Sequence, residues 1–238
     1  MRIGIVIPVL NQFEKAVQAI QSIQTEHTFE IKVIPNYQYG WSVSRAWNNG
    51  IDWSLRRHHS LTLVINDDIL FTPQTIDNLV VNFCRLEQED KLALLTGNNI
   101  RDLFSDPFET LIYATDVKSL QERPDFSCFM IRPTLVKKIG YFDENFAPAY
   151  FEDNDFEYRI HLSGLNIYRD ISAPFYHYGS QTQNCNADQP VVPSDLFENR
   201  RAYYISKWGG NPGHETFTHP YNDQSLNYYN WHPLNDCN

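Results

Sequence analysis

The chain has 238 residues, 42% hydrophobic and 20% charged, and its 19 basic and 29 acidic residues give a net charge of −10. This length and composition predict one large globular domain, or one domain with a tail. The acidic balance argues against nucleic acid as a partner and offers no basic patch for a membrane surface. An anionic ligand would therefore need a local attractor such as a metal ion, an arginine or a helix N-terminus.

The sequence shows no targeting signal and no cysteine motif. No stretch approaches the roughly 18 consecutive apolar residues of a membrane-spanning helix, so we expect no integral membrane segment. Residues 1–8 form too short an apolar run for a signal peptide, which favours a soluble, cytoplasmic protein. The cysteines have no metal-ligand spacing, so we expect buried thiols at Cys84, Cys128, Cys185 and Cys237.

The first part of the chain alternates between apolar runs and helical patterns. Residues 2–9 predict a buried strand stopped by Pro8, and Asn11 is expected to cap the helix that follows. A second strand is predicted at residues 30–35, before a helix capped by Ser42. This alternation predicts a parallel sheet built of right-handed βαβ units.

A third apolar run covers residues 61–65 and ends in Asn66, Asp67 and Asp68. Its near-continuous apolar character predicts a strand buried on both faces. Ligands of open α/β sheets bind beyond the carboxyl ends of the strands, so the two acids stand where binding chemistry is expected. A polar turn after a strand is the structural alternative.

The middle of the chain is predicted to hold a helix that starts at Thr72 and Pro73. Strands are expected at residues 92–96, 111–114 and 126–131, followed by a short helix that ends at Gly140.

The last third is predicted to begin with a helix over residues 152–163, whose first turn holds Glu152, Asp153 and Asp155. Acids in a first turn also suit the helix dipole, which gives them a purely structural alternative. Two strands, one further helix and an aromatic-rich coil are expected at residues 166–171, 175–178, 194–208 and 211–238.

Four blocks in this order resemble a family 2 glycosyltransferase of the GT-A fold. They are residues 3–11, 40–51, 65–69, and 140–144 together with 150–155. The resemblance implies an α/β fold: a mainly parallel, Rossmann-like central sheet flanked by helices, with a small antiparallel acceptor-side sheet and an irregular C-terminal tail. It divides residues 1–180 into a nucleotide-sugar half to about residue 100 and an acceptor half. Residues 181–238 would form a C-terminal helix and an aromatic-rich extension on the same domain.

The implied reaction is inverting, metal-dependent transfer of a sugar from a nucleotide-diphosphate sugar to a saccharide or another hydroxyl acceptor. Asp68, His177 and Asp67 would hold Mn²⁺ or Mg²⁺, which suit mixed carboxylate and imidazole ligation better than Ca²⁺ does. Asp153 would be the general base, with Glu152 as the second candidate. A helix N-terminus lowers a carboxyl pKa, so burial or a neighbouring acid would have to offset that effect.

The resemblance also implies a set of substrate contacts. These residues are Pro8, Asn11, Asn36, Trp41, Asn48, Asn66, Asp67 and Asp155. Asn36 stands where the family usually has an aspartate that reads the nucleobase, which leaves uracil recognition open. Asp155 lies four residues before Arg159, a spacing that also predicts an ion pair orienting the helix.

Two other functions are compatible with parts of the pattern. A sugar-phosphate nucleotidyltransferase would share the sheet and the metal, but it would need a glycine-rich basic loop after the first strand, where residues 9–13 read Val-Leu-Asn-Gln-Phe. A non-catalytic relative that binds a nucleotide or carbohydrate is the third possibility.

Overall fold

A computed structural model describes residues 1–101, 124–179 and 195–226 of the chain. The strands are β1 (Arg2–Val9), β2 (Thr28–Pro35), β3 (Leu61–Ile65), β4 (Ile69–Phe71), β5 (Leu92–Asn99), β6 (Cys128–Ile131) and β7 (Asn166–His177). The α-helices are α1 (Phe13–Gln21), α2 (Asn36–Tyr39), α3 (Val43–Arg56), α4 (Thr75–Asp90), α5 (Val136–Ile139), α6 (Glu152–Leu162) and α8 (Leu196–Trp208). Short 3₁₀ turns are η3 (Pro133–Leu135), η4 (Glu144–Phe146) and η5 (Pro220–Asn222).

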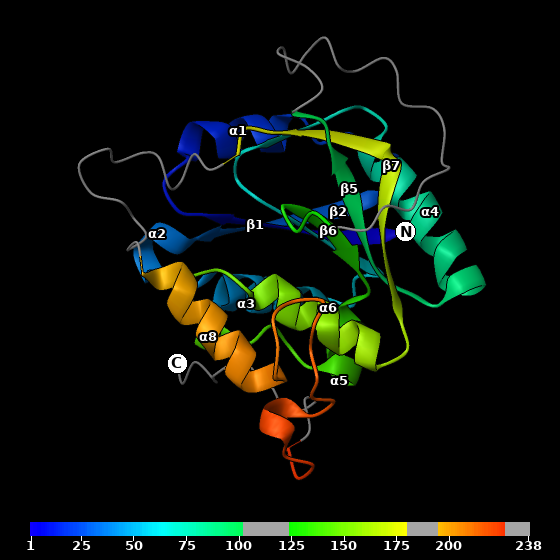
Figure 1. Cartoon of the computed structure of the whole chain (residues 1–238). Coiled ribbons are helices and arrows are strands. Elements are labelled where there is room, and N and C mark those ends of the chain that lie inside the picture. The colour runs from blue at the N-terminus through cyan, green and yellow to red at the C-terminus, as the bar shows by residue number, and fades with distance from the viewer. Residues whose placement is uncertain (102–123, 180–194, 227–238) are drawn as a thin grey trace.

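The strands form one seven-stranded sheet in the order β2-β1-β3-β6-β5-β7-β4 (Figure 1). β1 pairs in parallel with β2 and β3, and β5 pairs in parallel with β7. β6 runs antiparallel between β3 and β5, and β4 runs antiparallel to β7. The expected α/β class is confirmed. The antiparallel strands, expected as a separate small sheet, belong to the same sheet within the described residues.

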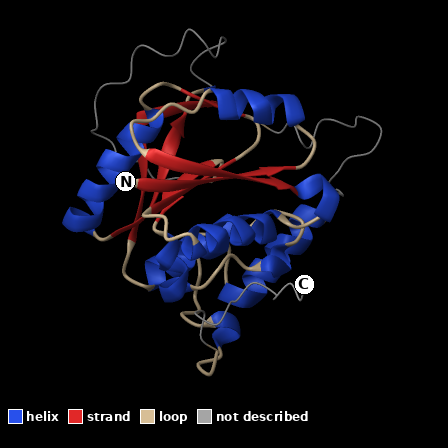
Figure 2. Cartoon of the chain, turned by 180° about the vertical axis from the view of Figure 1, so that it is seen from behind, coloured by secondary structure: helices blue, strands red, loops and turns tan. Residues whose placement is uncertain are grey.

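Helices cover both faces of this sheet (Figure 2), and each face has its own apolar core. Ile5 and Leu63 pack with α1 and α4 on one face, whereas Val6 and Val64 pack with α3, α5 and α6 on the other. All five residues of β3 are buried, as its near-continuous apolar run predicted. The close approach of α3 to β1 depends on Gly50, where a Cβ atom would lie 2.1 Å from Cγ1 of Val6.

Helix starts follow the sequence signals only in part. Oγ of Ser42 accepts a hydrogen bond from the Arg45 N–H at 3.1 Å, so the predicted cap of α3 is confirmed. The cap of α1 is Gln12 without a side-chain bond, so the prediction for Asn11 was wrong. β1 also continues past Pro8 to Val9, and α4 begins at Thr75, later than predicted.

The two strands predicted in residues 166–178 are one strand, β7, with an irregularity at the predicted break. Thr96 of β5 lies opposite Arg169, but Asn98 lies opposite Pro174, so β7 carries extra residues between these two pairs. Nδ2 of Asn82 in α4 donates to Oδ2 of Asp170 in this bulge at 2.8 Å. After the bulge β7 pairs with β4 and places His177 opposite Ile69.

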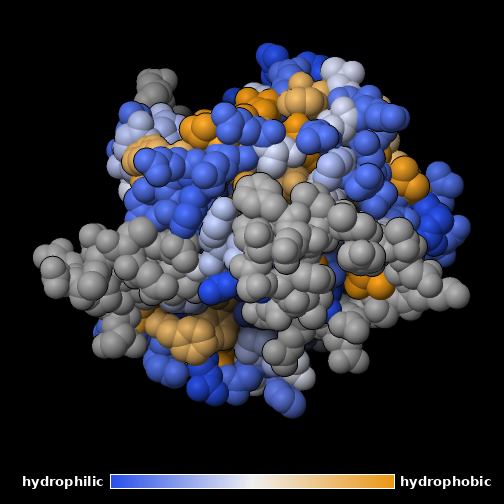
Figure 3. Space-filling model, turned by 90° about the horizontal axis from the view of Figure 1, so that it is seen from above, coloured by the Kyte–Doolittle hydropathy of each residue, from blue (hydrophilic) through white to orange (hydrophobic). Residues whose placement is uncertain are grey.

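The remaining expectations concern the surface and the cysteines. No helix in the described ranges is long and apolar enough to cross a membrane. From above (Figure 3), most of the visible described surface is hydrophilic, with hydrophobic side chains in separate small patches. Cys128 is a buried free thiol, as predicted, and Cys84 is partly buried. Cys185, Cys237 and the strand predicted at 111–114 lie outside the described residues.

Candidate active site

Asp68 and His177 meet at the sheet edge where β3 and β7 end. Oδ1 of Asp68 lies 3.0 Å from Nε2 of His177. The antiparallel pairing of β4 with β7 causes this contact, and the Tyr178 N–H donates to the Asp68 carbonyl at 3.0 Å. Asp68 is buried and the His177 side chain is 17% exposed. Two of the three predicted metal ligands therefore point at one place.

Asp67 has a different set of contacts from Asp68. Its Oδ2 accepts the Leu10 N–H at 3.2 Å, which ties the loop after β1 to the end of β3. Burial, with a contribution from the charge of Asp68, raises the pKa of Asp67 to about 6. No three His, Cys, Asp or Glu side chains are clustered as a metal site in the part of the chain that the structure describes. A ligand role for Asp67 stays a prediction.

The donor set of Asp68 and His177 fits Mn²⁺ or Mg²⁺. One carboxylate oxygen and one imidazole nitrogen converge, which is a mixed ligation that suits Mn²⁺ well. Mg²⁺ is commonly bound through one or two protein groups, with waters and substrate phosphates as its other ligands. The two side chains are therefore compatible with such an ion, and their role as its ligands stays a prediction.

Glu152 and Asp153 form the first turn of α6. Glu152 is 7% exposed, and its Oε2 is buried without a hydrogen-bond partner. Burial, reinforced by the charge of Asp153, raises the pKa of Glu152 to about 8. Burial also raises the pKa of Asp153, whose Oδ1 accepts the Asn154 N–H at 2.8 Å. The burial that must offset the helix dipole is thus present.

The turn before α6 has an unusual backbone. Tyr150 and Phe151 have φ angles of 82° and 68°, a region that aromatic residues rarely occupy. The ring of Phe151 packs against Phe197 and Tyr204 of α8, with ring centres 5.0 Å and 5.8 Å away. Such strained turns cluster at functional sites and persist only where surrounding contacts hold them.

Asp125 is a candidate active-site residue that could not be picked out from the sequence. Its Oδ1 accepts hydrogen bonds from the N–H and Oγ of Ser127, at 2.9 Å and 2.5 Å. The Ser127 carbonyl in turn accepts the Asn66 N–H at 2.8 Å. After burial and the charge of Glu157, the charge of Asp125 further raises the pKa of Asp153. The turn before β6 is therefore hydrogen-bonded to the end of β3.

Asp155, predicted to touch substrate, is fully buried. Its Oδ2 accepts from Nε and Nη2 of Arg159 at 2.9 Å and 2.8 Å, so the predicted ion pair is confirmed. Its Oδ1 lies 2.6 Å from Nζ of Lys207 and accepts from Nε1 of Trp208 at 2.8 Å. Although burial opposes ionisation, the charges of Arg159 and Lys207 lower the pKa of Asp155. Both oxygens of Asp155 are thus used inside the protein, and its predicted substrate contact stays a prediction.

Asn48, also predicted to touch substrate, uses its side-chain amide inside the protein, and its substrate contact stays a prediction. It is fully buried, and its Nδ2 donates to the Phe142 carbonyl at 2.8 Å and to Oε1 of Glu144 at 3.0 Å. Its Oδ1 accepts the Phe142 N–H at 2.9 Å. Asn48 therefore fixes the segment before η4 against α3.

Asn36 and Trp41 shape a turn beside the end of β2. The Asn36 amide donates to the Trp41 carbonyl and accepts the Trp41 N–H, both at 3.0 Å. The Trp41 ring stacks on Tyr39 with ring centres 4.3 Å apart. Asn36 therefore has a structural use of its own, and its substrate contact stays a prediction. Substrate contacts also stay predictions for Trp41, Pro8, Asn11 and Asn66, which are all half-buried.

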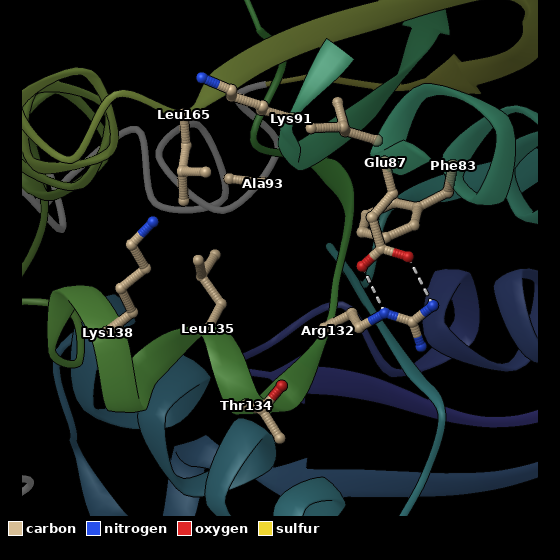
Figure 4. A pocket seen from close by; sticks show the side chains of 10 residues that line it. Phe83, Glu87, Lys91, Ala93, Arg132, Thr134, Leu135, Lys138 and Leu165 are labelled. Carbon is tan, nitrogen blue, oxygen red and sulfur yellow. Dashed lines mark hydrogen bonds and ion pairs between the residues drawn. The ribbon is translucent and has the colours of Figure 1, made fainter. Parts of the chain in front are cut away.

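A pocket of about 340 Å³ lies away from these residues (Figure 4). It is lined by the end of α4, the start of β5, the η3–α5 turn and the turn before β7. In its wall, Nε of Arg132 donates to Oε1 of Glu87 at 2.5 Å. Nη1 of Arg132 donates to the Ser60 carbonyl, which precedes β3. The pocket is thus at the amino end of β3, opposite Asp67 and Asp68.

The chain is similar in sequence to a glycosyltransferase over about half its length. No protein-family model matches it. It is 25% identical to a galactofuranosyl glycosyltransferase of Leishmania donovani over 115 residues, which are 48% of this chain and 24% of the relative. The matched part therefore spans about a quarter of the length of that relative.

Solved glycosyltransferase structures share the fold. A Drosophila β1,4-galactosyltransferase 7 variant in complex with manganese, UDP-Gal and xylobiose superposes with a TM-score of 0.51 at 15% identity, covering 84% of this chain and 79% of that one. Its catalytic domain in complex with xylobiose gives 0.51 at 14% identity, covering 91% and 82%. S. aureus TarS gives 0.52 at 15% identity, covering 76% and 37%. The GT-A fold and the resemblance to glycosyltransferases are confirmed.

Proposed function

We propose that the chain is an inverting, metal-dependent glycosyltransferase that moves a sugar from a nucleotide-diphosphate sugar to a hydroxyl of a saccharide or another acceptor. The observation that carries this proposal is the contact of Asp68 with His177 at the carboxyl edge of a GT-A sheet. The Leishmania relative and the neighbour that holds manganese, UDP-Gal and xylobiose support it.

Asp68 and His177 would hold the divalent cation, Mn²⁺ or Mg²⁺. When bound, the ion supplies positive charge for the diphosphate that leaves the donor. The buried position of Asp68 keeps its carboxylate away from competing solvent, and the β4–β7 ladder fixes both side chains before a ligand arrives.

Asp153 would accept the proton of the acceptor hydroxyl. As that oxygen forms a bond to the anomeric carbon, the bond from this carbon to the diphosphate oxygen breaks, and its electron pair leaves with the diphosphate. A raised pKa makes an ionised Asp153 a stronger base than an exposed aspartate. Glu152, with a pKa of about 8, keeps its proton at neutral pH. This difference supports Asp153 over Glu152 as the base.

The test is a panel of UDP, GDP, dTDP and CMP sugars with Mn²⁺, in which release of the nucleotide reports turnover. Asp68→Asn and Asp153→Asn should each lower kcat by about 100-fold or more. Asp52→Asn is the matched control, since it changes a carboxylate of α3 that pairs with Arg56 and has no contact with Asp68, His177 or Asp153 among those the structure shows, and it should keep full activity. Full activity of both site variants would refute the assignment. Saturable nucleotide binding without turnover would favour the non-catalytic relative.

Two further expectations remain predictions. The division into a donor half, an acceptor half and an extension at residues 181–238 can be tested by limited proteolysis, which should cut first between these parts. The cytoplasmic location can be tested by fractionation of cells that express the tagged protein.

A further inference from the structure

Lys207 of α8 lies between two buried carboxylates. Its Nζ is 2.6 Å from Oδ1 of Asp155 and 2.7 Å from Oδ2 of Asp143, and all three residues are fully buried. With Arg159, which binds the other oxygen of Asp155, two cations balance two anions. A buried charge that loses its partner is strongly destabilising, so this group holds α8, α6 and the turn before η4 in one arrangement.

Trp208 adds a directional contact to the same group. Its Nε1 donates to Oδ1 of Asp155 at 2.8 Å, and its ring meets Tyr158 of α6 edge-on at 5.0 Å. One turn earlier, the Tyr203 hydroxyl donates to Asp143 at 2.9 Å. The end of α8 thus contacts Oδ1 of Asp155 in α6 through Lys207 and Trp208, and Asp143 before η4 through Lys207 and Tyr203.

The first half of α8 contacts the other side of the acidic turn. Phe197 packs against both Tyr150 and Phe151, the two residues with positive φ, with ring centres 5.4 Å and 5.0 Å away. Tyr204 packs against Phe151 as well. α8 therefore holds the two residues before Glu152 and, through Asp155, the chain two residues after Asp153.

Because Asp155 is held by α8, the geometry of helix α6 determines the side on which the Asp153 side chain lies. Successive helical residues are about 100° apart, so Asp153 and Asp155 point roughly 200° away from each other. Because Asp155 is drawn inward by Lys207 and Trp208, Asp153 is directed to the opposite side of α6. Asp153 is accordingly half-buried, whereas Asp155 is fully buried.

We propose that Lys207 and Trp208 are positioning residues that set where the carboxylate of Asp153 lies relative to the acceptor. This inference rests on the proposed function, because it assigns these residues a part in the same reaction. They act through Asp155.

The test compares Lys207→Met, Lys207→Arg and Trp208→Phe with the wild-type protein, using the donor that gives turnover in the panel. Trp208→Phe removes the indole N–H and keeps a ring. We expect kcat to fall about 10- to 100-fold in Lys207→Met and about threefold to tenfold in Trp208→Phe. Donor KM should change less than about twofold, because Asp68 and His177 hold the donor. Lys207→Arg should restore most of kcat.

Tyr158→Phe is the matched control, since it removes a 2.9 Å hydrogen bond from the same helix to the Phe217 carbonyl without touching Asp155. It should keep kcat even if the thermal midpoint falls. Wild-type kcat in Trp208→Phe, or an equal loss in Tyr158→Phe, would overturn the positioning role. If Lys207→Met does not fold, Trp208→Phe decides alone.

Failure of the proposed function can be told apart from failure of this inference. A wild-type protein without turnover on any donor counts against the proposed function. Crystal structures of wild type and Trp208→Phe then decide the positioning role without turnover. A shifted Asp153 carboxylate relative to Asp68 supports it, and an unmoved one overturns it.

Discussion

The buried carboxyl of Glu152 makes the stability of the protein depend on pH. Burial beside Asp153 raises its pKa from 4.5 to about 8. Between these values the folded protein keeps a proton that the unfolded chain has released, so the free energy of unfolding falls as pH rises. The slope is about 1.4 kcal/mol per pH unit, which accumulates to roughly 3 kcal/mol between pH 4.5 and pH 7.

Glu152→Gln removes this titration. The new amide, still without a partner, adds a cost that does not depend on pH, so the slope is the quantity to measure. We expect urea unfolding of the variant, followed by tryptophan fluorescence between about pH 5 and 8, to lose about 1.4 kcal/mol per unit of the wild-type slope. Glu14→Gln, exposed on α1, should leave the slope unchanged. Parallel profiles for wild type and Glu152→Gln would refute the reasoning.

Three further predictions concern other sites. Asn48→Ala leaves the N–H and carbonyl of Phe142 unpaired in the interior and should lower the free energy of unfolding in urea by about 2–4 kcal/mol. A decrease below about 0.5 kcal/mol would contradict a stabilising role for these two hydrogen bonds. Lys91→Gly should raise the thermal midpoint, because exposed Lys91 ends α4 at φ 52°, a left-handed conformation that costs about 1 kcal/mol. A lower midpoint would show that the lysine side chain matters more than the strain. His177→Gln should weaken Mn²⁺ binding to the protein with UDP by about tenfold or more in calorimetry, whereas an unchanged affinity would remove His177 from the metal site.

The strands at the centre of the sheet could be predicted because their environment is uniform. β3 is covered on both faces, and four of its five residues are aliphatic, so the strand could be predicted and the two acids after it placed at the sheet edge. Resemblance to known enzymes placed His177 with Asp68, but the physical cause is the register of β4 against β7. That register depends on strands separated by a long stretch of chain.

Two of the predicted substrate contacts lie inside the protein for a common reason. Asn48 and Asp155 are polar residues in motifs that resemble a binding site, yet both are fully buried. Their partners, Phe142 and Lys207, are distant in sequence, so the sequence shows the hydrogen-bonding capacity but hides where it is used. For Asp155 only the local pair with Arg159 could be predicted.

Asp125 shows the opposite case, a residue near the site that no local pattern marked. An acidic residue just before an apolar strand is common in turns, where Asp side chains accept backbone N–H bonds. The feature that brings Asp125 close to the site is the direction of β6. Because β6 runs antiparallel to β3, its beginning must lie beside the end of β3, and residues before it return to the edge that holds Asp67 and Asp68.

β7 should tolerate an inserted residue inside its bulge but not between the bulge and His177. Side chains alternate between the faces of a strand, so one residue inserted between Pro174 and His177 would turn the imidazole to the other face of the sheet. One residue inserted at positions 170–173 would enlarge a bulge that α4 already holds, and the register with β5 would resume at Pro174 as before. Alignments of relatives should therefore place gaps in the bulge and keep a constant distance from Pro174 to His177.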